Sequence, residues 1–180
     1  QFLAYDLRNP NSIHSCVAAA RENARTIRET ITGSMWEQIN TFFLFVTNGA
    51  KHGGALAEPN EFCNAVKRAS HTLLGLTEST MSHGEPWHFA RMGRLMERAD
   101  KTSRIVDVQY FLLLPRAQDV GTQLDVVRWS ALLRSTSALE MYRRVHGRIE
   151  PHSVAQFLLL DRDFPRSILF CLLRVEDSLH

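Results

Sequence analysis

Eight histidines are the first side chains in this sequence that could do chemistry, because a neutral imidazole is a common metal ligand. Glu85 and His88 have the Glu-x-x-His spacing found in carboxylate-bridged di-iron bundles. Such a centre also needs a second Glu-x-x-His and two further glutamates on facing helices, and the sequence contains no second copy. The pair stands where a helix should begin, so the helix dipole explains the glutamate. We therefore expect no bound metal and no other cofactor.

The sequence contains none of the common catalytic or phosphate-binding motifs. A zinc-binding His-Glu-x-x-His, a Cys-x-x-Cys pair, a glycine-rich phosphate loop and a Gly-x-Ser-x-Gly turn are all missing. The three cysteines, Cys16, Cys63 and Cys171, are odd in number and far apart. We expect them to be buried and reduced, as in a cytoplasmic protein. These observations leave an enzymatic activity undecided and favour a role without catalysis.

The densest charge pattern of the chain lies between Trp87 and Leu114. Apolar residues recur there at spacings of three and four, which predicts one long helix. Pro86 suits the first turn of that helix, where a missing N–H group is tolerated. Pro115 ends it, because proline cannot continue the hydrogen-bond ladder. The opposite side carries pairs of opposite charge, namely Arg94 with Glu97, Glu97 with Lys101, and Asp100 with Arg104.

Two interpretations of this charged side remain open. If the side is solvated, each pair contributes only about 0.2–0.5 kcal/mol to the helix. If it is partly buried, a carboxylate beside arginines could bind a carboxylate or phosphate group. The second interpretation is favoured by the apolar neighbours Ile105 and Val108, and by Gly93, which weakens a helix unless another backbone packs close. We predict a buried network around Glu97 and Arg98, and the candidate binding residues are Arg94, Glu97, Arg98, Asp100 and Arg104.

Length and composition indicate an ordinary globular protein. The chain has 180 residues, of which 44% are apolar and 22% charged, enough for one domain with a substantial core. The net charge of +2 gives no reason to expect nucleic acid or a membrane as a partner. No apolar run is long enough to cross a bilayer, and no signal peptide is visible. We therefore expect a cytoplasmic location.

Helical periodicity extends over most of the remaining sequence. Ser12 is suited to cap the first helix, and Ser34 and Ser137 each begin a capping box that ends in glutamate. No segment has the alternation of a strand. We predict an all-α bundle or array of about seven or eight helices and no strands. The expected helices are 12–32, 34–47, 59–76, 87–114, 126–133, 137–145, 151–160 and 163–175, with loops at 48–58 and 116–123.

Three blocks of sequence, in this order, resemble the bacterial Alpha-E domain family. They are NPNSIHSCVAAARENARTIRETITGSMWEQIN at 9–40, WHFARMGRLMERADKTSRIVDV at 87–108 and WSALLRSTSALEMYRR at 129–144. That family is a helical domain named for its Glu-Arg motif. The matching residues here are Glu97-Arg98, followed by Ala99-Asp100 and Arg104. The resemblance extends over essentially the whole chain.

The resemblance has implications for domain boundaries and for function. Family members usually begin with a helix that carries an earlier copy of the motif. We therefore expect 1–180 to be one Alpha-E-like domain that lacks its N-terminal helix, with truncation at the C-terminus left open. The family is similar to accessory components found beside ATP-grasp ligases and transglutaminase-like peptidases. This favours a non-catalytic module that binds an ATP-grasp-type ligase or a transglutaminase-like protein. The alternative is an enzyme or ligand-binding domain with a carboxylate–arginine site on the central helix, and the sequence does not indicate an oligomeric state.

Overall fold

A computed structural model describes residues 2–52, 57–113 and 123–179. These residues form helices joined by turns and contain no strand, which confirms the predicted all-α class. They divide into two compact units, Gln1–Trp87 and His88–His180, and each unit is described by itself. Most of the loop expected at 116–123 lies outside the described residues. The helices are α1 (Ile13–Thr26), α2 (Gly33–His52), α4 (Pro59–Thr80), α5 (Glu85–Leu113), α6 (Gln123–Ser135), α7 (Leu139–Val145), α8 (Pro151–Leu160) and α9 (Ile168–Glu176).

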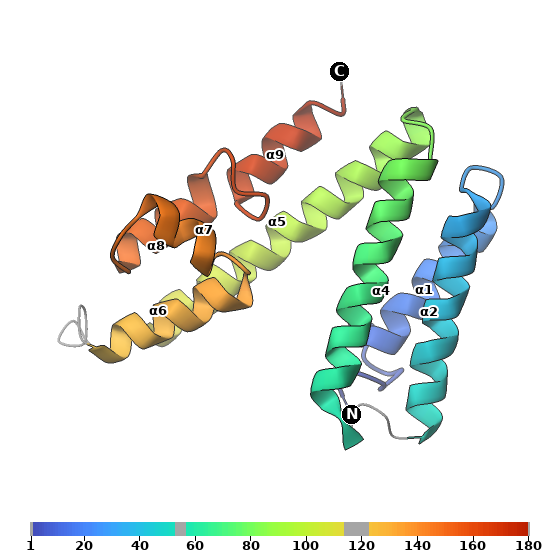
Figure 1. Ribbon diagram of the computed structural model, residues 1–180, viewed down its shortest axis with the longest axis horizontal. Helices are drawn as coiled ribbons and strands as arrows, with labels where there is room; N and C mark the ends of the chain where they lie inside the picture. The colour runs from blue at the N-terminus through green and yellow to red at the C-terminus, as the bar shows by residue number, and fades with distance from the viewer. Residues whose placement is uncertain (1, 53–56, 114–122, 180) are drawn as a thin grey trace. The chain divides into compact units, whose positions relative to one another are not determined.

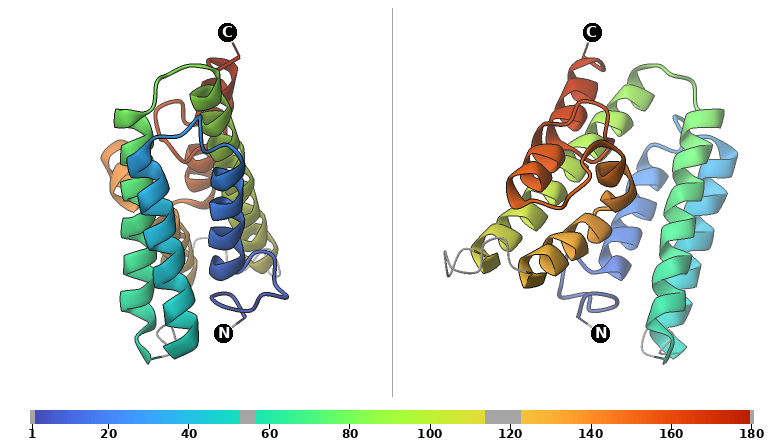
Figure 2. Two further views of the ribbon diagram at one scale, coloured as in Figure 1. Left: turned by 90° about the vertical axis from the view of Figure 1, so that its right-hand side faces the viewer. Right: turned by 60° about the vertical axis from the view of Figure 1, so that its left-hand side comes forward.

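The first unit packs α1, α2 and α4 side by side, with α2 in contact with both of the others (Figures 1 and 2). The predicted cap of α1 is confirmed, because the Ser12 hydroxyl accepts a hydrogen bond from the Ser15 amide at 3.1 Å. The core of this unit is the apolar side of the helices together with the chain that enters α5. Its buried members are Ala24, Ile31, Met35, Ile39, Met81 and Trp87.

Two helix boundaries in the first unit differ from the prediction. α1 ends at Thr26, and the expected continuation to residue 32 is a run of turns. α2 begins at Gly33, where the Thr32 hydroxyl accepts from the Met35 amide at 3.3 Å, so Thr32 replaces Ser34 as the capping side chain. α2 also continues past residue 48, where the loop was expected to begin, as far as His52. At Gly49 an added Cβ would lie 2.7 Å from the Tyr5 hydroxyl, so a distant tyrosine accounts for the glycine there.

Two arginines, one on α1 and one in the turn after it, lie against aromatic rings of α2. The Arg21 guanidinium lies 4.8 Å from the Phe43 ring centre and 6.0 Å from that of Trp36. Arg28 lies 5.7 Å from the same Trp36 ring. The Arg21 Nε group donates to Asn40 Oδ1 at 2.7 Å. Cation–π contacts of this kind contribute about 0.5–1 kcal/mol at exposed sites, so these arginines take part in helix packing.

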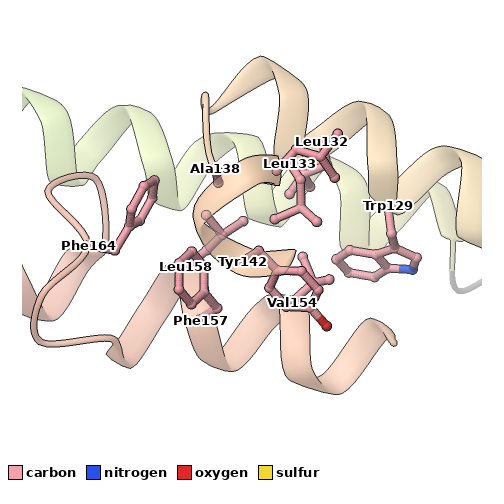
Figure 3. Close-up of a cluster of buried hydrophobic side chains, with 10 residues drawn as sticks. Trp129, Leu132, Leu133, Ala138, Tyr142, Val154, Phe157, Leu158 and Phe164 are labelled. Atoms are coloured by element: carbon pink, nitrogen blue, oxygen red, sulfur yellow. The ribbon is translucent and has the colours of Figure 1, made fainter. Parts of the chain in front are cut away.

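The second unit is built on α5. α9 lies along the N-terminal half of this helix and α6 along its C-terminal half, with α7 and α8 completing the layer (Figures 1 and 2). Figure 3 shows its main core, in which Leu133, Tyr142 and Leu158 are completely buried. The Tyr142 hydroxyl donates to the Arg148 carbonyl at 2.9 Å, which fixes the turn between α7 and α8. The hydroxyl of this buried ring thus joins α7 to the turn that precedes α8.

Two helix starts in the second unit also differ from the prediction. α7 begins at Leu139 with no side-chain cap, because Ser137 has a φ of 54° and does not reach the helix amides. α9 begins at Ile168 and not at residue 163, with the Ser167 hydroxyl accepting from the Phe170 amide at 3.0 Å. Residues 161–167 instead form a loop in which Asp161 accepts from the amides of two following residues. The carbonyls of this loop accept hydrogen bonds from side chains of α5.

The three cysteines differ from one another in burial. All three cysteines are free thiols, but only Cys171 is buried. The expectation of burial is wrong for Cys16 and Cys63, which lie on exposed helix positions. Within the described ranges, no helix combines the length and apolar character needed to cross a membrane.

Candidate functional site

The candidate binding residues all lie on α5, which presents one side to α9 and another to the surface. Leu95 and Ala99 of α5 pack against the completely buried Cys171 of α9. Ile168, Phe170 and Val175 surround this contact. The seam is short and apolar, and it fixes the rotation of α5 in the second unit. Because consecutive helical residues point about 100° apart, this rotation sends Glu97 and Arg98 in different directions.

Arg98 points toward the loop that precedes α9. Its guanidinium Nη1 donates to the Pro165 carbonyl at 3.1 Å. One turn further along, the Thr102 hydroxyl donates to the Arg166 carbonyl at 2.9 Å, and Thr102 is buried. Two adjacent carbonyls of the loop are thus held by two side chains of α5. The Cys171 thiol reaches the same Pro165 carbonyl at 3.7 Å.

Burial is the main electrostatic effect at this contact. It lowers the pKa of the half-buried Arg98, and the like charges of Arg166 and Arg94 act in the same direction, opposed by Cys171. Arginine starts from a pKa so high that the side chain stays protonated. Burial also raises the pKa of the Cys171 thiol, although the nearby Arg98 lowers it. Cys171 is therefore held as a neutral thiol in the packed structure.

Glu97 lies on the surface. Its side chain is 65% exposed and pairs with Lys101, the Lys101 Nζ atom lying 3.1 Å from Glu97 Oε1. The prediction of a buried Glu97–Arg98 network is therefore wrong for Glu97. Arg98 is half-buried, but its hydrogen bond goes to a backbone carbonyl. The physical reason is the position of the α9 seam, which covers only the Arg98 side of the pair.

Asp100 and Arg104 form another of the three predicted pairs. The Arg104 Nε group donates to both oxygens of Asp100, at 3.0 and 2.8 Å. This hydrogen bond lowers the pKa of Asp100 and raises that of Arg104. Arg94, the remaining candidate, is half-buried on the same helix. Arg98 therefore contacts the loop before α9, whereas Glu97, Asp100 and Arg104 take part in surface pairs.

The surface around these pairs also carries apolar side chains. Phe89 is 63% exposed and Met96 is 52% exposed, and both lie on α5. Gly93 lies between them at helical spacing, and a Cβ placed on it would meet nothing within 4 Å. The expected close approach of another backbone at Gly93 is therefore not seen. Phe89, Gly93 and Met96 form one continuous stripe of the helix.

Metal-binding side chains are dispersed in the part of the chain that the structure describes. No three histidine, cysteine, aspartate or glutamate side chains come close enough there to hold an ion. Glu85 is exposed in the first turn of α5, as its dipole explanation suggested, and His88 is half-buried.

The fold and the site define a class of protein: an all-helical chain whose only Glu-Arg pair, Glu97-Arg98, lies on its longest described helix. The Alpha-E family, described as "a predicted alpha-helical domain with a conserved ER motif", matches residues 1–180. The chain therefore belongs to the Alpha-E family. No curated protein and no solved structure matched the chain.

Sequence reasoning missed the groups that join α5 to the loop before α9. Thr102 was not a candidate, although a small polar residue four positions after Arg98 within an apolar stripe is a signal that could have been read. The carbonyls of Pro165 and Arg166 carry no such signal, because a backbone acceptor is present at every position. Only the folded loop brings them to α5.

Proposed function

We propose that this chain is a non-catalytic accessory module of a bacterial, cytoplasmic peptide-modifying system. Its partner in this proposal is an ATP-grasp-type ligase or a transglutaminase-like protein. The resemblance of the sequence to accessory components of such systems supports the identity of the partner. The observation that carries a binding role is the exposed side of α5, where apolar side chains and ion pairs lie together.

The composition of this surface is typical of an interface. Aromatic residues and methionine are enriched at the centres of protein interfaces, and charged residues are typical of their rims. On α5, Phe89 and Met96 supply the apolar part. Glu97, Asp100 and Arg104 continue the same surface toward the C-terminal end of the helix. We define these five residues as the α5 face.

Arg98 has a supporting role in this proposal. By holding the Pro165 carbonyl, it keeps the loop before α9 against one side of α5. Together with the seam against Cys171, that contact holds the rotation of the helix and so determines which side chains the α5 face presents. The conserved Glu-Arg motif would then combine an exposed acidic residue for the partner with a basic residue that positions the helix.

Co-purification with the ligase tests the proposal. The chain and an ATP-grasp-type ligase from the same genome are co-expressed, and the ligase is captured through an affinity tag. Met96→Asp should abolish recovery of the chain, because it places a charge at the apolar centre of the α5 face. Val145→Asp is the matched control, since Val145 is 66% exposed on α7, away from that face.

Recovery of Met96→Asp at the level of the unaltered chain would reject the α5 face as the interface. A transglutaminase-like protein from the same genome provides the second bait. Failure of both baits to recover the unaltered chain would reject the proposed partners.

A further inference from the structure

A groove between α5 and α6 lies in the second unit, apart from Phe89 and Met96. Its volume is about 450 Å³, within the range of about 300–1,000 Å³ typical of small-ligand sites. Ile105 and Val108 of α5 and Leu132 of α6 form an apolar wall. Lys101 and Arg104 line the same groove and bring positive charge to it. An apolar wall beside two cations suits a ligand that joins an anion to an apolar group.

The carboxylates that pair with these cations leave donors available. Arg104 binds Asp100 through Nε, so its Nη1 and Nη2 groups have no hydrogen-bond partner among the described residues. Lys101 Nζ lies 3.1 Å from Glu97 and 3.8 Å from Asp100. Glu97 and Asp100 do not line the groove. Asp100 therefore acts as a positioning residue that holds the Arg104 guanidinium, while the two terminal N–H groups can form the paired hydrogen bonds that carboxylates accept.

Two further polar groups narrow the choice of ligand. The Ser135 hydroxyl lines the groove and donates its own proton to the Leu132 carbonyl at 2.8 Å. It can therefore accept a hydrogen bond from an incoming N–H group. Gln109 also lines the groove, and its side-chain amide forms no hydrogen bond with a described residue. An acceptor and a free amide beside an anion site match the main chain of a peptide.

We propose that this groove binds the C-terminal end of a peptide whose last side chain is apolar. The terminal carboxylate binds Arg104 and Lys101, and the last side chain packs against Val108 and Leu132. The Ser135 hydroxyl accepts from the last peptide N–H. The groove shares Arg104 with the α5 face, but its other lining residues lie outside that face, so Met96→Asp tests the partner proposal without altering the groove.

Calorimetric titration of the whole chain with two forms of one peptide tests the proposal. The probes are N-acetyl-alanyl-alanyl-leucine with a free carboxylate and the same peptide with a C-terminal amide. The free acid should bind about tenfold more tightly, as expected for one charge-assisted pair. Hexanoate, which has a carboxylate and an apolar tail but no peptide group, should bind several-fold more weakly than the free acid.

Two groove variants and two controls connect the result to the groove. Arg104→Gln should weaken binding of the free acid about tenfold, whereas Arg144→Gln, at an exposed position on α7, should leave it unchanged. Ala131→Glu adds a carboxylate to the groove at an exposed position of α6, so it should abolish binding without lowering the melting temperature. Met96→Asp, which tests the partner proposal, should not affect peptide binding.

Several results would overturn the inference. Equal affinity for the free acid and the amide would show that the groove does not recognise the terminal carboxylate. Binding of hexanoate as tight as that of the peptide would show that the groove does not recognise a peptide main chain. Unchanged binding by Ala131→Glu would place the site elsewhere.

Discussion

Arg98 and Glu97 are adjacent in the motif, and the structure predicts that their removal has very different consequences. Arg98→Met keeps most of the apolar stem but loses the 3.1 Å hydrogen bond to the Pro165 carbonyl. A hydrogen bond to a charged group contributes about 1.5–3 kcal/mol, and half-burial places this one near the lower limit. We therefore expect a cost of about 1.5 kcal/mol to the packing of the α9 loop. Glu97→Gln removes only an exposed pair with Lys101 and should cost less than about 0.5 kcal/mol.

Thiol labelling measures this local cost directly, because Cys171 is completely buried under the loop that Arg98 holds. Cys16 and Cys63 are exposed, so both are replaced by serine to leave one reporter. With excess reagent, labelling requires the loop to open. The thiol is then solvated and Arg98 no longer lies beside it. A loss of about 1.5 kcal/mol should raise the labelling rate by roughly tenfold in Arg98→Met.

The serine background without further change and Glu97→Gln are the controls, and both should label at the same slow rate. An unchanged rate in Arg98→Met would show that the Pro165 contact contributes nothing to holding the loop. A tenfold acceleration in Glu97→Gln would instead support the buried network that the sequence predicted. The double variant should behave as the product of the two single effects, because no hydrogen bond or ion pair of the described structure joins the two side chains.

Three further predictions test other parts of the fold. Tyr142→Phe removes the donor to the Arg148 carbonyl and should lower the free energy of unfolding by about 1–2 kcal/mol in urea; no change would mean that the bond is dispensable. Hydrogen bonds from the side chain and backbone of Arg8 lower the pKa of Asp6 from 3.8 to about 2. The stabilising effect of these bonds is therefore complete above the ordinary pKa, and it is lost as the pH falls through about 2. Carboxyl-carbon NMR should show that low midpoint, and a midpoint near 3.8 would contradict the contact. Ser12→Ala removes the cap of α1 and should cost about 1 kcal/mol in thermal unfolding, and an unchanged melting temperature would count against the cap.

Local interactions account for what could be predicted from sequence. The all-α class follows from the three- and four-residue spacing of apolar residues, because this spacing places them on one side of a helix. The Ser12 cap depends on an amide only three residues away. The pairs Glu97–Lys101 and Asp100–Arg104 join positions four apart, which α-helix geometry alone brings together. In each case the two partners lie within one turn of the same helix.

The tertiary structure decided the features that depend on distant partners. Sequence placed Glu97 and Arg98 together in one buried network, whereas packing of α9 covers only Arg98. The groove between α5 and α6 likewise requires residues from two helices, so no single segment could indicate it. Gly49 stays in a helix despite its turn-like sequence, and the hydroxyl of a distant Tyr5 occupies the space beside it. The sequence by itself therefore determined the all-α class and the charge pairs four positions apart on α5, but not where every helix ends. Which side of each helix is covered depends on long-range contacts, because a helix pattern defines the sides but not the neighbour that packs on them.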